Sequence, residues 1–391
     1  MSMSSGVEKL WNSSFVLAFI ANFMMMMAFY MLMPTLPFYL IESLGLVKST
    51  VGLVVSIYII SAVVFRPFSS YLIDTLNRKP LYVFVYLLFT AVFGGYLVFT
   101  SVALLLVTRI VQGAIWGIVI PLGNTLALDI MPASRRGTGI GYFGMSSTLA
   151  MALGPWAGLA LFGEIGFSGI VACSITTSIV GVLLALFIKA PHKPHGNAQP
   201  LSLDRFVLLK ALPVATNVIL ACFSYGLVIA YAALYGSELG VGSAGLFFIV
   251  MSGGVIVARL VSGRYIDRGF YNQISLVSLV MLAISFLLLG LLPNVWIYFS
   301  MAFIIGISCG MFFPTIQTMV VGIAEHHQRG TATSTFFTAF DVGVGLGMLL
   351  GGIIAEWQSL SFAFIIGAIA NLLALAYYLR FTYPKYKKRK V

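Results

Sequence analysis

Residues 66–74 read RPFSSYLID, and residues 259–267, which lie 193 positions further on, read RLVSGRYID. Four of the nine positions are identical, including the first arginine and the final aspartate. A constant offset across separate segments indicates that the chain was duplicated. The same offset aligns Gly52 with Gly245, Gly117 and Pro121 with Gly310 and Pro314, Arg136-Gly137 with Arg329-Gly330, and Gly154 and Gly158 with Gly347 and Gly351.

Composition places both halves in a lipid bilayer. Of the 391 residues, 60% are apolar and 8% are charged, and the mean hydropathy is +1.03. A soluble protein is about one-quarter charged and just under half apolar. The composition therefore excludes a soluble enzyme, a nucleic-acid-binding protein and a disordered chain, and it predicts an all-α polytopic membrane protein.

Polar breaks divide the sequence into twelve apolar runs, each long enough to cross a hydrocarbon core of about 30 Å as a helix. The longest break, Ala190–Arg205, contains three prolines and a glycine, as a linker does. We therefore expect two pseudo-symmetric six-helix bundles at 1–189 and 208–382, a cytoplasmic linker at 190–207 and a basic cytoplasmic tail at 383–391. The predicted spans are 12–38, 49–72, 80–100, 102–128, 138–163, 167–189, 208–235, 243–263, 273–292, 294–321, 331–355 and 361–382.

Basic residues are distributed unequally between the two sides of these spans. Eighteen of the 22 lysines and arginines fall in one alternate set of breaks, whereas only Lys48 falls in the other set. The positive-inside rule therefore predicts that both termini lie in the cytoplasm. We expect the protein to be a multi-pass protein of a bacterial inner or plasma membrane. The net charge of +11 is thus mostly an orientation signal and does not indicate a nucleic-acid partner.

Four segments resemble signatures of the major facilitator superfamily, and the resemblance covers nearly the whole chain. It implies two six-helix bundles that give alternating access to a central site near the bilayer midplane. The segment in span five resembles the antiporter signature of drug/proton exporters, and the segment in span eleven is similar to an exporter subgroup that includes metallophore exporters. The four segments are the loop Ser70–Lys79, Arg109-x2-Gln112-Gly113 in span four, Gly154-Pro155-x2-Gly158 in span five and Phe340-Asp341-x-Gly343-x-Gly345-x-Gly347 in span eleven.

Asp341 is the only one of the eleven acidic residues that falls in the middle of a predicted span. It lies about 16 Å from the cytoplasmic end of that span, where an ionised carboxylate is costly and the group can carry a proton. The functional interpretation is a proton-coupling site. The alternative is a structural acid that is permanently paired.

Arg66 is the predicted partner of Asp341. It lies about 12 Å from the same face, and the resemblance implies that spans two and eleven meet between the halves. We therefore hypothesise a switchable pair that closes when Asp341 is ionised and loosens when it is protonated. The alternative is that the Arg66 side chain reaches the cytoplasmic interface. The duplicated counterpart would be Arg259 with Thr148, where the acid is missing.

Arg109 is a third candidate for proton coupling. The resemblance implies a role in proton transfer or substrate contact, and the arginine has no counterpart in the second half, because residue 302 is alanine. The alternative is an interfacial arginine that binds backbone carbonyls.

The charged residues within the spans are three arginines and one aspartate. This net positive charge disfavours cationic cargo and favours anionic, zwitterionic or amphiphilic cargo. Polar candidates for substrate binding are Asn22, Tyr30, Gln112, Asn124, Asn217 and Gln317.

Charged residues at the inner ends of spans two to four are candidates for a gate: Asp74, Arg78 and Asp129. The resemblance implies that Asp74 approaches the N-terminus of span eleven, and the partial positive charge of a helix N-terminus would attract it. The alternative is a role in folding and topology, which is the stronger interpretation for Arg78 because it is also a positive-inside signal.

These features predict a secondary active transporter, with proton-coupled efflux of a small amphiphilic drug or metabolite as the first interpretation. Proton-coupled uptake of a nutrient or organic anion is the alternative. A membrane enzyme or receptor would need a catalytic constellation, and the sequence offers no metal cluster, nucleotide motif or Ser/His/Asp set at depth. We expect no cofactor and no metal. The expected partners are a small-molecule substrate, protons and the lipid bilayer, for a monomeric protein.

Overall fold

The computed structural model describes residues 10–98, 101–132, 135–191, 208–243, 245–323 and 329–384, and its long elements are all helices in that part of the chain. Short π-helical turns, Tyr39–Ser43 and Tyr378–Thr382, extend the first and the last helix. The helices are α1 (Ser13–Phe38), α2 (Lys48–Thr75), α3 (Arg78–Phe93), α4 (Gly95–Val98), α5 (Val102–Ile130), α6 (Arg136–Leu186), α7 (Leu212–Glu238), α8 (Leu246–Asp267), α9 (Tyr271–Leu291), α10 (Val295–Ile323), α11 (Arg329–Trp357) and α12 (Leu360–Tyr377).

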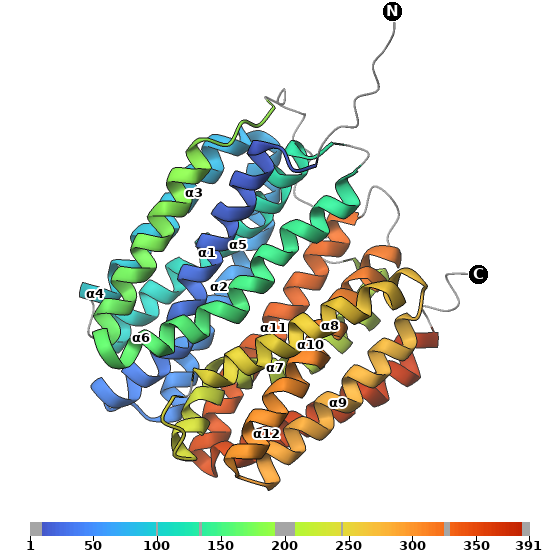
Figure 1. Cartoon of the computed structure of the whole chain (residues 1–391). Helices are drawn as coiled ribbons and strands as arrows, with labels where there is room; N and C mark the ends of the chain where they lie inside the picture. Colours follow the sequence, from blue (N-terminus) through green and yellow to red (C-terminus); the bar gives the residue numbers. More distant parts are fainter. Residues whose placement is uncertain are drawn as a thin grey trace, which may run out of the picture.

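The helix α6 contains two of the predicted spans. Its 51 residues would extend for about 77 Å, far more than one bilayer crossing requires. The chain turns at Gly166, whose φ of 65° and ψ of −177° suit only glycine, and Figure 1 shows α6 folding back there. Ten helices in the described residues are long and apolar enough to cross a membrane, and Leu246–Ser262 is a shorter apolar one. Counting both arms of α6 and adding α8 gives the twelve predicted spans.

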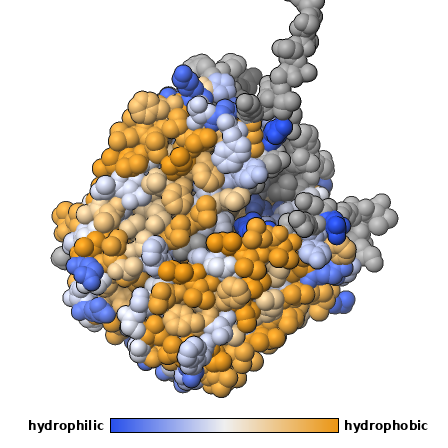
Figure 2. Space-filling model, in the orientation of Figure 1, coloured by the Kyte–Doolittle hydropathy of each residue, from blue (hydrophilic) through white to orange (hydrophobic). Residues whose placement is uncertain are grey.

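Local sequence explains where several helices begin. Asn12 caps α1, since its side-chain oxygen accepts a hydrogen bond from the Phe15 amide at 2.8 Å. Ser359 caps α12 in the same way, at 3.1 Å from the Phe362 amide. Large apolar side chains remain exposed along the outer faces, and Figure 2 shows apolar colour over most of the visible surface. A bilayer would cover such a surface.

The helices form two groups, which Figure 1 shows as α1–α6 in blue to green and α7–α12 in yellow to red. Contacts between the groups are made by α2 with α11, by α6 with α8 and by α1 with α7. The first two contacts are equivalent under the duplication, and the third joins the first helices of the two halves. The predicted all-α fold of two pseudo-symmetric bundles is therefore confirmed. The exact domain boundaries stay a prediction, because residues 192–207 lie outside the described part.

We call the end of the molecule where α1 begins and α12 ends the terminal end, and the other end the opposite end. Residues Lys48, Glu238 and Glu356 lie at the opposite end, where α2 begins and α7 and α11 finish. Arg78 and Asp129 lie near the terminal end, where α3 begins and α5 finishes.

Candidate functional site

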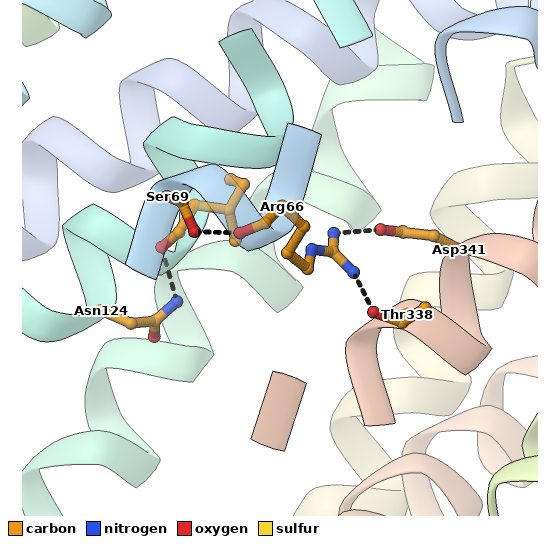
Figure 3. Close-up of polar contacts among 6 residues, drawn as sticks. Arg66, Ser69, Asn124, Thr338 and Asp341 are labelled. Atoms are coloured by element: carbon orange, nitrogen blue, oxygen red, sulfur yellow. Dashed lines mark hydrogen bonds and ion pairs between the residues drawn. The ribbon is translucent and has the colours of Figure 1, made fainter. Parts of the chain in front are cut away.

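Arg66 and Asp341 form an ion pair between α2 and α11. The guanidinium Nη2 donates to the Asp341 carboxylate, and Nη1 donates to the Thr338 hydroxyl at 3.2 Å (Figure 3). The side chains are 6% and 14% exposed, so the pair is largely withdrawn from water. The two helices belong to different bundles, and the pair is therefore an ionic contact between the bundles. The predicted Arg66–Asp341 pairing is present in the structure.

The duplicated position carries the same arginine without the acid. Arg259 of α8 donates from Nη2 to the Thr148 hydroxyl of α6 at 3.3 Å. This is the contact that the 193-residue offset predicts. The acceptor is an uncharged hydroxyl and the arginine is exposed, so one of the two equivalent contacts between the bundles is an ion pair and the other is not.

Arg109 is fully buried in a cage of aromatic rings and amide groups. Its guanidinium carbon lies 5.3 Å from the Tyr58 ring centroid and 5.8 Å from that of Tyr96. Nη1 donates to Gln112 Oε1 at 2.9 Å, and Nη2 lies 3.4 Å from the Met33 sulfur. The interfacial alternative, in which the arginine binds backbone carbonyls, is therefore not what the structure shows.

Two donors in this cage have no partner in the described residues: Arg109 Nε and Gln112 Nε2. Gln112 Oε1 accepts from both Arg109 and the Tyr96 hydroxyl, the latter at 2.6 Å, which fixes the orientation of the amide. Among the described residues that contact the guanidinium, tyrosine rings stabilise the positive charge and no carboxylate does. Arg109 is thus a buried cation held between the rings of Tyr58 and Tyr96.

The amide candidates for substrate binding lie at different places. Asn22 of α1 donates to Ser146 and Ser147 of α6, at 2.7 and 3.0 Å. Asn217 of α7 donates to the Ala374 carbonyl of α12 at 2.6 Å, inside the second bundle.

The remaining candidates are less deeply engaged. Asn124 donates to the Ile120 carbonyl of its own helix at 2.9 Å, and Gln317 of α10 is half-buried. Tyr30 of α1 is buried against α6, where its Cβ packs next to Gly154. Tyr30 shares a neighbour with Tyr58 of α2, since the Phe29 ring centroid lies 5.4 Å from that of Tyr30 and 5.3 Å from that of Tyr58. No contact between described residues joins Asn22 or Asn217 to the Arg66–Asp341 pair. Substrate roles for all of these residues stay predictions.

Two of the three predicted gate residues meet at the terminal end. Arg78 Nη1 donates to the Asp129 carboxylate at 2.6 Å, and Arg78 Nε donates to the Ile73 carbonyl at 3.2 Å. This contact joins α3 to α5 within the first bundle. The Asp74 side chain lies outside the described part, so its predicted approach to α11 stays a prediction.

A second set of polar contacts crosses between the bundles at the opposite end, and sequence reasoning did not find it. Lys48 Nζ lies 2.7 Å from Glu238 Oε1, which joins α2 to α7. The Ser49 amide donates to Glu356 Oε2 at 2.8 Å, which joins α2 to α11. Glycine at position 52 permits this approach, because a Cβ there would lie 2.8 Å from the Met348 carbonyl oxygen. The opposite end is therefore closed where α2 meets α7 and α11.

Thr338 is another residue that the sequence did not reveal. It precedes Asp341 by three positions, so it lies on the same face of α11 and reaches the same guanidinium. The i, i+3 spacing from a buried acid was the available signal.

No group of three or more His, Cys, Asp and Glu side chains in the described residues could hold a metal ion.

Across the described residues the apolar spans form two duplicated bundles with buried charges at their interface, which is an architecture that secondary transporters use. The family model described as the Major Facilitator Superfamily matches residues 18–276 and 214–391, and the chain belongs to that superfamily. The resemblance seen in the sequence signatures is thereby confirmed.

Curated relatives match over most of their length. The staphylopine export protein of Staphylococcus aureus is 23% identical over 363 residues, covering 88% of this chain and 90% of the relative. The multidrug resistance protein MdtG of Enterobacter lignolyticus is 25% identical and covers 94% of this chain and 91% of the relative. The quinolone resistance protein NorA of S. aureus is 25% identical and covers 87% and 89%.

Solved structures share the fold at low identity. A bacterial homologue of the human lysosomal transporter Spinster, in an inward-facing and unoccupied conformation, superposes with a TM-score of 0.78 at 14% identity and 98% coverage of both chains. The nucleoside transporter NupG gives a TM-score of 0.75 at 17% identity, with coverage of 94% of this chain and 98% of that one.

Proposed function

We propose that this protein exports a small amphiphilic drug or metabolite in exchange for protons, and that Asp341 is the proton-carrying group. The observation that carries the proposal is the ion pair of Asp341 with Arg66, which connects α2 of one bundle to α11 of the other. An ionisable residue at this depth of a membrane span is a functional site by default. Here it also has a partner whose attraction depends on its charge.

Protonation would change the contact between the bundles. The ionised carboxylate attracts Arg66 and holds α2 against α11. The protonated carboxyl loses that attraction, so the helices can separate and the central site can open to the other side. The Arg109 guanidinium lies against the Tyr58 ring. Its charge would make the electrostatic potential near the same site more positive. In this scheme proton uptake and bundle movement are one event.

The contacts at the two ends supply gates in the same scheme. We assign the terminal end to the cytoplasm from the distribution of basic residues. Arg78 and Asp129, with Asp74, would order the cytoplasmic end of the first bundle. Lys48 with Glu238, and Ser49 with Glu356, would hold the outer end closed while the cytoplasmic end receives cargo. A single chain contains both bundles, which supports a monomer.

The named functions of the relatives support export over uptake. One relative is named an export protein and two are named resistance proteins, and each matches most of this chain. Uptake by proton symport is the competing direction. A pH gradient of either sign across proteoliposomes separates the two, because an antiporter moves cargo against the proton flow and a symporter moves it with that flow.

The experiment compares two transport modes for wild-type protein and Asp341→Asn in proteoliposomes, after a thermal-shift screen has provided a bound cargo. Exchange of labelled for unlabelled cargo needs no net proton movement, whereas concentrative transport under an imposed pH gradient does. We expect Asp341→Asn to retain exchange and to lose gradient-driven transport, because its amide cannot take up a proton. Wild-type rates of gradient-driven transport in this variant would refute the proposal.

The duplication provides a matched control. Thr148→Val removes the acceptor of Arg259 at the equivalent contact between the bundles, where there is no acid. This variant should keep both exchange and gradient-driven transport. Loss of proton coupling in both variants would mean that any disturbance of the bundle interface uncouples transport, and that Asp341 has no special role.

A further inference from the structure

Buried tyrosines in this protein differ in how their hydroxyls are bonded. Several donate to a backbone carbonyl at 2.6–3.0 Å, as is usual for a buried phenol. Tyr30, Tyr58 and Tyr225 are 8%, 5% and 5% exposed, yet no hydroxyl among them has a hydrogen-bond partner in the described residues. The tyrosines that donate to a carbonyl are Tyr86, Tyr231, Tyr235 and Tyr298.

The three hydroxyl oxygens are not fully sealed. Polar atoms that are sealed and have no partner occur in the described chain, for example Arg109 Nε, but the oxygens of Tyr30, Tyr58 and Tyr225 are not among them. Water or a bound molecule can therefore supply the hydrogen bonds that the protein does not, and this avoids the cost of about 1–3 kcal/mol for a sealed donor without a partner. The Tyr82 hydroxyl of α3 is likewise neither bonded nor sealed in the described residues, so what distinguishes the three hydroxyls is their place on helices that meet between the bundles.

These three residues come from helices that meet between the bundles. Tyr30 is on α1, Tyr58 is on α2 and Tyr225 is on α7, while α1 packs on α7 and α2 packs on α11. The Phe29 ring centroid lies 5.4 Å from that of Tyr30 and 5.3 Å from that of Tyr58. The Tyr225 ring centroid lies 5.9 Å from that of Phe340, the residue that precedes Asp341 on α11. The hydroxyls thus gather beside the Arg66–Asp341 pair.

Each bundle contributes a cluster of aromatic rings that includes one of these tyrosines or its direct neighbour. In the first bundle, Phe29 stacks on Trp116 with ring centroids 4.1 Å apart and planes inclined at 24°. In the second bundle, Tyr225 and Phe340 each pack edge-to-face against Phe313, at 5.4 and 5.2 Å. Aromatic faces on two sides favour a planar ring between them, since ring pairs gain about 0.5–1.5 kcal/mol beyond burial.

The charged groups of the region favour a bound molecule that carries acceptors. Arg66 and Arg109 bring two positive charges against the single carboxylate of Asp341, and Arg66 Nε has no partner among the described residues. Each of the three phenols can either donate or accept a hydrogen bond. A molecule with acceptors therefore suits the unpartnered guanidinium donor, whereas an ammonium would add a third positive charge.

We propose that Tyr30, Tyr58 and Tyr225 read the cargo, and that the cargo is a planar aromatic compound carrying carbonyl or carboxylate acceptors. The inference rests on the proposed function only in taking the space between the bundles as the cargo site. The aromatic walls hold the ring, and the three hydroxyls donate to its acceptors. Specificity then resides in tyrosine hydroxyls rather than in the amide side chains of Asn22 and Asn217, which are engaged within the protein.

The test measures equilibrium binding to the purified full-length protein in detergent, without a pH gradient. The probes are 2-naphthoate, which has a ring and acceptors, 2-naphthylmethylammonium, which has the ring with a donor cation, and cyclohexanecarboxylate, which has acceptors without the aromatic ring. We expect 2-naphthoate to bind at least tenfold more tightly than the other two. Tyr30→Phe, Tyr58→Phe and Tyr225→Phe should each weaken 2-naphthoate binding about tenfold, because each loses one hydrogen bond to a charged acceptor and keeps its ring.

A matched control is Tyr298→Phe, which also removes one buried hydroxyl, but one that donates to the Ala232 carbonyl at 2.9 Å. It should leave 2-naphthoate affinity unchanged while lowering thermal stability. Equal affinity for 2-naphthoate and 2-naphthylmethylammonium, no binding of 2-naphthoate, or wild-type affinity in all three Tyr→Phe variants would overturn the proposal. The last result would assign the hydroxyls to water. Because binding is measured without a proton gradient, failure of the coupling proposal for Asp341 would leave this result unaffected.

Discussion

Removal of the Arg66 guanidinium should destabilise the protein strongly, and removal of both partners should not. In Arg66→Ala the Asp341 carboxylate stays largely buried at the contact between α2 and α11 and loses its only cationic partner in the described residues. Breaking a buried ion pair on one side costs about 3–5 kcal/mol, because a charge remains without compensation. The hydrogen bond to Thr338 adds about 1 kcal/mol.

The double variant Arg66→Met/Asp341→Leu replaces the pair by apolar side chains of similar volume. Substitutions of this kind are often neutral or stabilising. We therefore expect the free energy of unfolding to fall by about 3–5 kcal/mol in Arg66→Ala and to recover to within about 1 kcal/mol of wild type in the double variant. The single variant should suffer more as pH rises, because its carboxylate must then ionise without a partner.

The assay is reversible unfolding of the purified protein from mixed micelles, followed by helical circular dichroism at several pH values. Thr338→Val in the wild-type background isolates the smaller hydrogen bond. The reasoning would be refuted if Arg66→Ala lost less than about 1 kcal/mol at every pH, or if the double variant were as unstable as the single one. Either result would mean that the pair contributes little in the folded state.

Three further predictions concern the ends and the turn of the structure. Gly52→Ala should separate α2 from α11 at the opposite end, since the new Cβ would lie 2.8 Å from the Met348 carbonyl oxygen; spin-label distances between the two helix ends should lengthen. Glu238→Gln should reduce the closed population by up to about fivefold in the same measurement, because its pair with Lys48 is partly exposed and such pairs contribute about 0.2–1 kcal/mol. Gly166→Ala should lower the unfolding free energy by about 1–3 kcal/mol, because an alanine at φ 65° and ψ −177° is strained; an unchanged thermal midpoint would contradict this.

Much of the architecture could be predicted because it depends on properties that are local in sequence. Apolar runs define spans, and the constant offset from Arg66 to Arg259 defines the duplication. The same offset anticipated the contact of Arg259 with Thr148. Depth along a helix follows from residue counting, so the pairing of Arg66 with Asp341 was also within reach once spans two and eleven were taken to be neighbours.

Contacts that depend on the rotation of a helix about its axis could not be predicted in this way. Residue counting gives the depth of Tyr58 but not the fact that its ring lies against the Arg109 guanidinium on one side and against the Phe29 ring on another. The same limit applies to the closed opposite end, where Lys48 meets Glu238 because three helix ends from two bundles converge. An almost uniformly apolar helix carries little periodic signal about which face is buried.

The duplication also explains why, of the two equivalent arginine contacts between the bundles, we propose a proton switch only for the one with Arg66. Both halves inherited an arginine at the same depth, and both arginines reach across to the other bundle, to Asp341 from Arg66 and to Thr148 from Arg259. A hydroxyl cannot change its charge in the range where a carboxyl can, so the Arg259 contact responds little to protons. If Thr148→Asp created a second ion pair, each transport cycle would meet two charge-dependent contacts instead of one. We expect that variant to transport more slowly and to shift its pH dependence, whereas an unchanged pH profile would show that the added contact has no influence on the coupling.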